Sequence, residues 1–188
     1  MNNNYLTNDA KRYLFEFDDI LNKMAQKMLS RKITTNITDD FITCMIPHHQ
    51  AAIYMCQSLL NYTNYEPLKM IAYNIIKTQT NGIKQMQYVL NNSNKITNSN
   101  QDINFYNSMF FDITTTMVTK MISSIRSINI NLDFVSEMIP HHEGAVEMCN
   151  NLLKYSINPE LRKIATDIIR QQTEGIKILK EIQQQLSR

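Results

Sequence analysis

Apolar residues recur every three or four positions along three stretches of the first half of the chain, which is the spacing of one helix face. The first stretch predicts a helix over about residues 9–30, and its apolar stripe consists of Leu14, Phe17, Leu21, Met24 and Met28. A second helix is expected to begin after Thr38, a favourable cap followed by two aspartates that suit the positive end of the helix dipole, and to run to about Leu60. A third helix should begin near Pro67 and end near Leu90. Later in the chain, Asn158-Pro159-Glu160 predicts a helix start of the same kind more clearly, with a cap, a proline in the first turn and an acid.

The same pattern returns later in the chain without a gap. MIPHHQAAIYMC begins at Met45 and MIPHHEGAVEMC begins at Met138, an offset of 138 − 45 = 93 residues. The offset also pairs residues outside this motif: Tyr13 with Tyr106, Phe17 with Phe110, Met24 with Met117, Gln79 with Gln172 and Gly82 with Gly175. A gapless register over nearly a whole half-chain indicates an internal duplication. We therefore expect a single duplicated domain over residues 1–188, with repeat 1 at about 6–90, a polar linker at 91–102 and repeat 2 at about 103–188.

The duplication also predicts how the helices pack. Each half has three predicted helices with strongly apolar faces, and one half alone can cover these faces only in part. A four-helix core needs two helices from each copy. We therefore predict an all-α fold with pseudo-twofold symmetry, in which the second and third helices of both halves share one core and the first helices flank it.

The composition agrees with helices and excludes several classes of protein. Glycine (3) and proline (4) are scarce while methionine (12) is abundant, which favours helices joined by few turns. The net charge is only +2 and no basic run is present, so no nucleic-acid partner is expected. No signal peptide and no apolar run of about 18 residues is visible, which predicts a soluble, intracellular protein without a membrane partner. The three cysteines cannot all pair within the chain and favour a reducing compartment.

All four histidines of the protein lie in the two copies of the MIPHH motif. At about 3.6 residues per turn, two methionines, both histidines and a cysteine of each copy share one face of their helix. These candidate metal ligands are Met45, His48, His49, Met55 and Cys56 in the first copy, and Met138, His141, His142, Met148 and Cys149 in the second. Cu(I) and Ag(I) suit a thioether with an imidazole, whereas Zn(II) and Cu(II) suit imidazole with fewer sulfurs.

Other interpretations of the motif stay open. The histidines could form hydrogen bonds only, and the cysteines could pack as small apolar groups. A di-iron carboxylate site is disfavoured, because no glutamate stands three residues before either histidine pair. Pro47 and Pro140 either bend the helix just before each pair or mark a helix start. Gln79 and Gln172 interrupt apolar stripes and are expected to hydrogen-bond a buried group, either a histidine or another helix.

With these residues the chain resembles the family catalogued as domain of unknown function 305, over almost its whole length. The matching positions are Phe41 with Met45–Gln50, Ala52 and Met55; Leu68, Ala72, Ile75, Ile76, Gln79, Ile83 and Met86; Asp133 and Phe134 with Met138–Val146 and Met148; and Ile168, Ile169, Gln172 and Ile176. The resemblance implies a ferritin-like four-helix bundle, and some exported members of the family are associated with copper and silver binding through His and Met side chains. The chain departs from the family at Gly82 and Gly175, where a glutamate is usual, and it shows no export signal.

We therefore expect a non-enzymatic, soft-metal-binding helical bundle of the copper or silver type, with metal sequestration as its role. The histidines would supply nitrogen ligands and the methionines thioether ligands to Cu(I) or Ag(I), with Zn as a further candidate. The alternative is a structural or protein-interaction bundle that binds no metal. A metal-dependent oxidoreductase would need carboxylates that the motif lacks. The sequence leaves open whether the chain forms a homo-oligomer.

Overall fold

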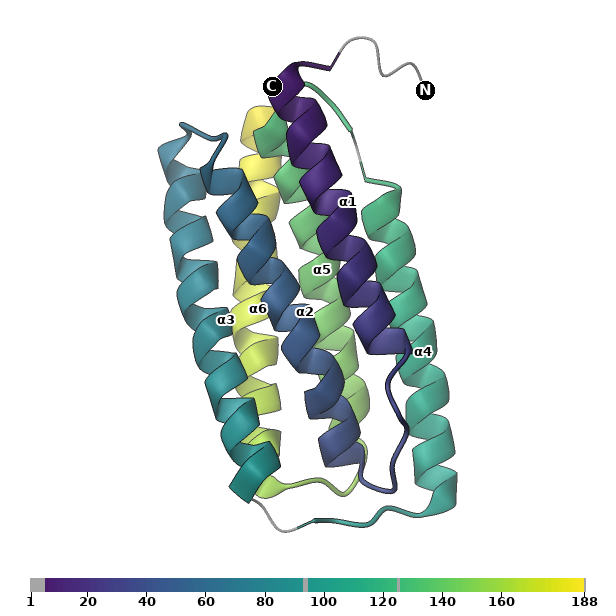
Figure 1. The fold of residues 1–188 in the computed structure, drawn as a ribbon. Helices are drawn as coiled ribbons and strands as arrows, with labels where there is room; N and C mark the ends of the chain where they lie inside the picture. The colour runs from purple at the N-terminus through teal and green to yellow at the C-terminus, as the bar shows by residue number, and fades with distance from the viewer. Residues whose placement is uncertain (1–5, 93–94, 125, 188) are drawn as a thin grey trace.

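The computed structural model describes residues 6–92, 95–124 and 126–187, and its regular structure is helical. Six helices follow one another along the chain (Figure 1): α1 (Asn8–Leu29), α2 (Ile37–Leu60), α3 (Glu66–Asn92), α4 (Asn100–Ile122), α5 (Ile130–Leu152) and α6 (Pro159–Leu186). The all-α prediction is thus confirmed, and each half contributes three helices. The linker is shorter than predicted, because α3 continues to Asn92 and α4 begins at Asn100. Residues 93–94 of the predicted linker lie outside the described residues.

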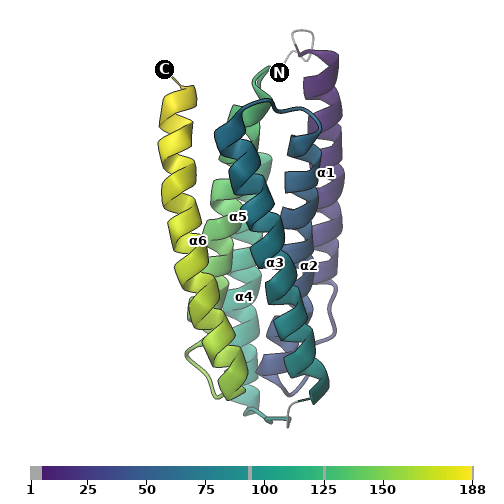
Figure 2. The same ribbon diagram turned by 90° about the vertical axis from the view of Figure 1, so that its left-hand side faces the viewer.

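The helices α2 and α5 form the centre of the molecule. The helix α2 packs against α1 and α3, α5 packs in the same way against α4 and α6, and α2 and α5 contact each other. The outer helices also touch, α1 with α4 and α3 with α6, so that two rows of three helices lie side by side (Figures 1 and 2). Since α2 and α5 have neighbours on three sides, most of their residues are buried, and the apolar core runs through all six helices. Even so, none of the described helices is long and apolar enough to cross a membrane.

Side-chain caps determine where α2 and α6 begin. Asn36 caps α2, because its Oδ1 accepts hydrogen bonds from the backbone N–H groups of Thr38 (3.0 Å) and Asp39 (3.4 Å). The prediction of Thr38 as the cap is therefore wrong. The Thr38 hydroxyl instead accepts a hydrogen bond from the backbone N–H of Asn158 (3.1 Å), which joins the start of α2 to the start of α6. Asn158 caps α6 with its own side chain, as the Asn-Pro-Glu sequence predicts.

A buried aspartate fixes the loop before each central helix. Asp40 accepts hydrogen bonds from the backbone N–H (3.0 Å) and the hydroxyl (2.8 Å) of Thr34. Asp133 accepts from the same groups of Ser127, again at 3.0 and 2.8 Å. Burial raises the pKa of both carboxyls, and these hydrogen bonds oppose that rise. The loop before each central helix is therefore held by the same kind of hydrogen bonds to a buried carboxyl.

Pro47 and Pro140 lie inside α2 and α5, which run through them as continuous helices. The interpretation of either proline as a helix start is therefore wrong. A proline within a helix has no N–H to donate, so the carbonyl four residues earlier loses its usual partner. A bend at either proline stays a prediction.

Candidate metal centre

The four histidines are buried near the middle of α2 and α5, where these helices contact each other. The rings of His48 and His141 stack, with centroids 3.7 Å apart and an interplanar angle of 30°. The Nε2 atom of His141 lies 3.2 Å from the carbonyl oxygen of His48. Because a carbonyl oxygen only accepts, His141 carries its proton on Nε2 in this bond, which leaves the lone pair on Nδ1. His48 and His141, the inner pair, thus bring the two MIPHH motifs together.

His49 and His142, the outer pair, point away from this stack. Their ring centroids lie 6.2 and 6.0 Å from those of the preceding histidines. The Cδ2–Nε2 edge of His49 faces α3, where a Cβ added at Gly82 would lie 3.0 Å from both atoms. The same edge of His142 faces Gly175 on α6, at 2.9 and 3.1 Å from such a Cβ. Consecutive helix residues point about 100° apart, so one histidine of each motif faces the other central helix and the next faces an outer helix.

Burial keeps all four imidazoles neutral at neutral pH. Removal from water lowers the pKa of His49 to about 3 and the pKa of His141 to about 4. Burial, with a further contribution from the neighbouring imidazoles, lowers the pKa of His48 and His142 well below the usual value. Neutral imidazole is the form that coordinates a metal ion. The site can therefore accept a cation without first releasing protons.

The histidines also keep unused hydrogen-bonding capacity. Among the described residues, the Nδ1 atoms of all four histidines and the Nε2 atom of His48 are buried without a hydrogen-bond partner. A buried polar atom without a partner costs about 1–3 kcal/mol, and in a native protein it points to a bound ion or water. The imidazoles therefore fit a metal ion. The described part of the chain contains no group of three or more His, Cys, Asp or Glu side chains arranged to hold one, so an ion that needs three such ligands in place fits less well.

The six predicted sulfur ligands lie in the apolar core of the same two helices. They are Met45, Met55 and Cys56 on α2, and Met138, Met148 and Cys149 on α5, all 0–2% exposed. Burial raises the pKa of the Cys56 and Cys149 thiols well above the usual value, so both stay protonated. Over the described ranges, the structure does not gather the cysteines and histidines into one ligand group. The role of the sulfurs as ligands stays a prediction.

Two buried glutamines share two cavities with the outer pair. One cavity is lined by His49, Gln79, Gly82 and Gln172, and the other by His142, Gln79, Gln172 and Gly175. The Oε1 atom of each glutamine has no hydrogen-bond partner among the residues that the structure describes, so the expected bond does not form through that oxygen. That Gly82 and Gly175 leave space for the rings of the outer pair was not predicted from the sequence. The available signal was that two of the 3 glycines stand at matching positions, each three residues after a glutamine.

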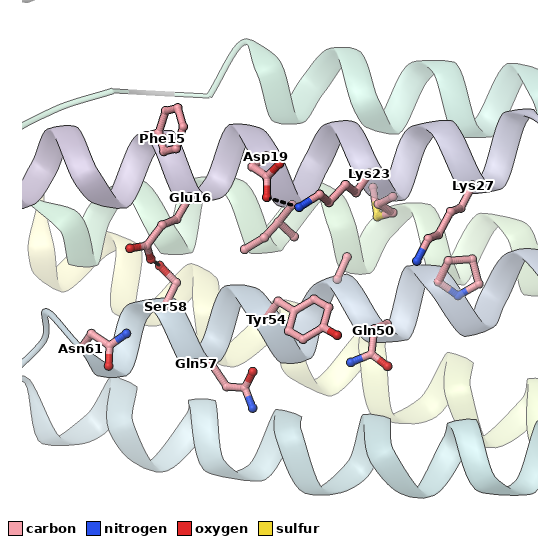
Figure 3. Close-up of a pocket in the computed structure, with 14 residues that line it drawn as sticks. Phe15, Glu16, Asp19, Lys23, Lys27, Gln50, Tyr54, Gln57, Ser58 and Asn61 are labelled. Atoms are coloured by element: carbon pink, nitrogen blue, oxygen red, sulfur yellow. Dashed lines mark hydrogen bonds and ion pairs between the residues drawn. The ribbon is translucent and has the colours of Figure 1, made fainter.

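A larger groove lies between α1 and α2 (Figure 3), and no histidine is among the residues that line it. It has a volume of about 630 Å³, and Gln50, Tyr54 and Gln57 are among the residues that line it. On one side of the groove, Glu16 Oε2 accepts a 2.6 Å hydrogen bond from the hydroxyl of Ser58. None of the ten predicted metal ligands lines this groove. The candidate metal centre is therefore the interface of α2 and α5.

The fold and the paired histidines define a class of all-helical protein in which two MIPHH motifs face each other across the core. The sequence matches the family described as "Domain of unknown function (DUF305)" over residues 19–90 and 39–183. The chain belongs to this family, which confirms the resemblance carried by its motifs.

Solved structures of the protein CopM are similar to this chain. The Cu(I)-bound form is 32% identical with a TM-score of 0.58, and the match covers 79% of this chain and 96% of that chain. The Cu(II)-bound form is 30% identical with a TM-score of 0.58, covering 79% and 97%. The Ag-bound form obtained by soaking is 31% identical with a TM-score of 0.57, covering 79% and 95%. A comparison with curated proteins found no match.

Proposed function

We propose that this protein binds a soft metal ion, Cu(I) or Ag(I), where the two MIPHH motifs meet between α2 and α5, and that it sequesters the ion without catalysis. The observation that carries the proposal is the stack of His48 on His141, in which three buried ring nitrogens have no partner among the described residues. Soft monovalent ions need few ligands, so two imidazoles with a thioether are sufficient.

The surroundings of the inner pair favour this class of ion. The candidate thioethers are Met45, Met55, Met138 and Met148 on the same two helices. A methionine side chain is flexible and can turn toward an ion without a movement of the backbone. A monovalent ion with neutral ligands also brings less charge into an apolar core than a divalent ion does. Cys56 and Cys149 are weaker candidates, because each must lose a proton against a raised pKa.

The relatives support the same class of ion. CopM has been solved with Cu(I), Cu(II) and Ag bound, and it resembles this chain in sequence as well as in fold. We infer further that the two halves arose by duplication. In this view α2, α3, α5 and α6 correspond to a ferritin-like four-helix core on which α1 and α4 pack, and the contacts of α2 with α5 and of α3 with α6 support it.

A second candidate function is that of a structural or protein-interaction bundle without metal. The bond from His141 to the backbone of His48 favours it, because this bond gives one imidazole nitrogen a structural role. The lack of a ready group of three His, Cys, Asp or Glu ligands within the described residues favours it as well. In such a protein the histidines would remain neutral and would bind no metal ion.

Metal uptake by the protein without a histidine tag separates these two functions. We expect elemental analysis after loading with Ag(I) or Cu(I) to find metal on the wild type and less on His48→Ala/His141→Ala. The matched control is Leu59→Ala/Leu152→Ala, which opens cavities at two buried positions of the same helices and removes no ligand. Circular dichroism verifies that both variants remain helical. Equal uptake by the histidine variant and the control would exclude the inner pair as the site.

A further inference from the structure

Two cavities open between α3 and α6, one beside each outer histidine. The first has a volume of about 150 Å³ and is lined by His49, and the second has a volume of about 190 Å³ and is lined by His142. Gln79 and Gln172 line both, so they form the wall that the cavities share. Each cavity also has basic and acidic lining residues, Lys77 with Asp167 in the first and Arg170 with Glu174 in the second. A volume of this size can hold an ion together with water ligands.

Each cavity offers nitrogen and oxygen donors without another use in the described structure. Gln79 and Gln172 are only 2% and 5% exposed, and their Oε1 atoms have no hydrogen-bond partner among the described residues. The Cδ2–Nε2 edges of His49 and His142 face α3 and α6. No methionine or cysteine is among the described residues that line either cavity. The available donors are thus imidazole nitrogen and oxygen atoms of amide and carboxylate groups, in contrast to the sulfur-rich helices around the inner pair.

Gly82 and Gly175 make room for these imidazole edges. A Cβ at either position would lie 2.9–3.1 Å from the ring, which is closer than carbon atoms normally pack, so the imidazole would have to shift. A glycine inside a helix is destabilising relative to alanine. The chain carries this destabilising residue at matching places in α3 and α6, each directly beside the edge of an outer imidazole.

We propose that each cavity is a separate binding site for a divalent ion of the Cu(II) class, ligated by one outer histidine and by the amide oxygen of Gln79 or Gln172, with water completing the coordination. Cu(II) suits nitrogen and oxygen ligands, whereas Cu(I) and Ag(I) prefer sulfur. The acidic and basic residues of each cavity balance in charge, so a cation is not repelled. The inference goes beyond the proposed function, because it concerns another class of ion at another place, beside the outer histidines and not at the stacked inner pair.

Titration of the tag-free protein with Cu(II), followed by equilibrium dialysis and electron paramagnetic resonance, tests the proposal. The variant Gln79→Leu/Gln172→Leu removes both amide oxygens and leaves every histidine and sulfur in place. We expect its Cu(II) affinity to fall by at least about tenfold, while its Ag(I) uptake stays unchanged. The matched control Gln87→Leu/Gln184→Leu makes the same change at exposed positions of α3 and α6 and should bind Cu(II) as the wild type does.

The glycines allow each cavity to be tested by itself. We expect Gly82→Ala to weaken binding in the first cavity only, so that tightly bound Cu(II) per chain falls by about half, and Gly175→Ala to do the same in the second. Unchanged Cu(II) affinity in the glutamine double variant, or an equal loss of Ag(I) and Cu(II), would overturn the proposal. If the glutamine and glycine variants weaken Cu(II) binding as expected but the wild type takes up no Ag(I), the proposed function is refuted and this inference stands.

Discussion

Tyr13 of α1 donates a 2.6 Å hydrogen bond to Oε2 of Glu137 on α5, and this bond joins the first half of the chain to the second. Both side chains are buried. At the offset of 93 residues the corresponding pair is Tyr106 with Cys44, since 13 + 93 = 106 and 137 − 93 = 44. The hydroxyl of Tyr106 is buried without a hydrogen-bond partner among the described residues. The two halves therefore differ here, because within the described residues only the hydroxyl of Tyr13 has a polar partner and that of Tyr106 has none.

This difference predicts unequal effects of removing the two hydroxyls. Tyr13→Phe leaves the buried carboxyl of Glu137 without its donor, so we expect the free energy of unfolding to fall by about 1–3 kcal/mol. Tyr106→Phe removes a hydroxyl that has no partner in the described structure, so its effect should be near zero or stabilising. Urea unfolding of both variants measures the difference, and equal destabilisation would contradict the assignment.

Acid should destabilise the metal-free protein between pH 7 and pH 5. The folded pKa values of the four histidines are lowered, to about 3 for His49 and about 4 for His141, whereas the unfolded chain takes up protons from about pH 6.5. The unfolded state thus binds more protons in this window, and stability is lost as the pH falls. We expect a loss of about 2 kcal/mol per histidine over these two pH units, measured by urea unfolding in the presence of a chelator.

Protonation of Glu137 changes the stability with pH in the opposite direction to the histidines, so this residue supplies the control. Burial raises its pKa well above the usual value, so the folded state holds a proton that the unfolded state has released, and this contribution to stability grows as the pH falls. Glu137→Gln should therefore steepen the acid loss, whereas His142→Phe should make it shallower. A free energy of unfolding that stays constant between pH 7 and pH 5 would show that the histidines are not held neutral.

The close packing of α4 on α5 depends on Gly144. A Cβ at this position would overlap the Met117 side chain. We expect Gly144→Ala to lower the free energy of unfolding by about 1–3 kcal/mol, although alanine is the better helix former. In the Met117→Ala background the clash is removed, so adding Gly144→Ala there should leave the free energy of unfolding unchanged or raise it. Equal destabilisation by Gly144→Ala in both backgrounds would contradict the clash. A double-mutant cycle by urea unfolding distinguishes these results.

Pro47 and Pro140 should not behave as ordinary helix-breaking residues. Replacing a proline inside a helix by alanine ordinarily gains about 3 kcal/mol of helix propensity. We expect Pro47→Ala and Pro140→Ala to gain much less, and to lower Ag(I) uptake, because each proline directly precedes a histidine pair inside a central helix. Pro67→Ala, in the first turn of α3, is the control and should change neither quantity. A large rise in melting temperature with unchanged uptake would mean that the prolines have no role in binding.

Separated halves of the chain should fold poorly. Residues 1–95 and 96–188 each contain three helices, and in the whole protein α2 and α5 bury part of their surface against each other. We expect each half, expressed alone, either to show low helicity or to form a dimer that imitates the whole. Circular dichroism and sedimentation measure both properties. Sharp thermal transitions from two monomeric halves would contradict a single shared core.

The sequence by itself determined the number and kind of helices, the family and the position of the candidate site. Apolar periodicity and capping residues act between neighbours in the chain, so six helices and the cap at Asn158 could be predicted. The cap at Asn36 was missed, because Thr38 is an equally suitable residue type and only the packing of α6 engages its hydroxyl elsewhere. The duplication, the ferritin-like core and the sulfur ligands stay predictions.

Only the tertiary structure decided how the histidines differ from one another. Sequence periodicity places His48 and His49 on one helix face, but it does not say which helix lies opposite each of them. That depends on the approach of helices far apart in the chain, which brings His48 onto His141 and His49 against Gly82. The low histidine pKa values follow from the same packing, because burial from all sides is a property of the assembled core and not of any one helix.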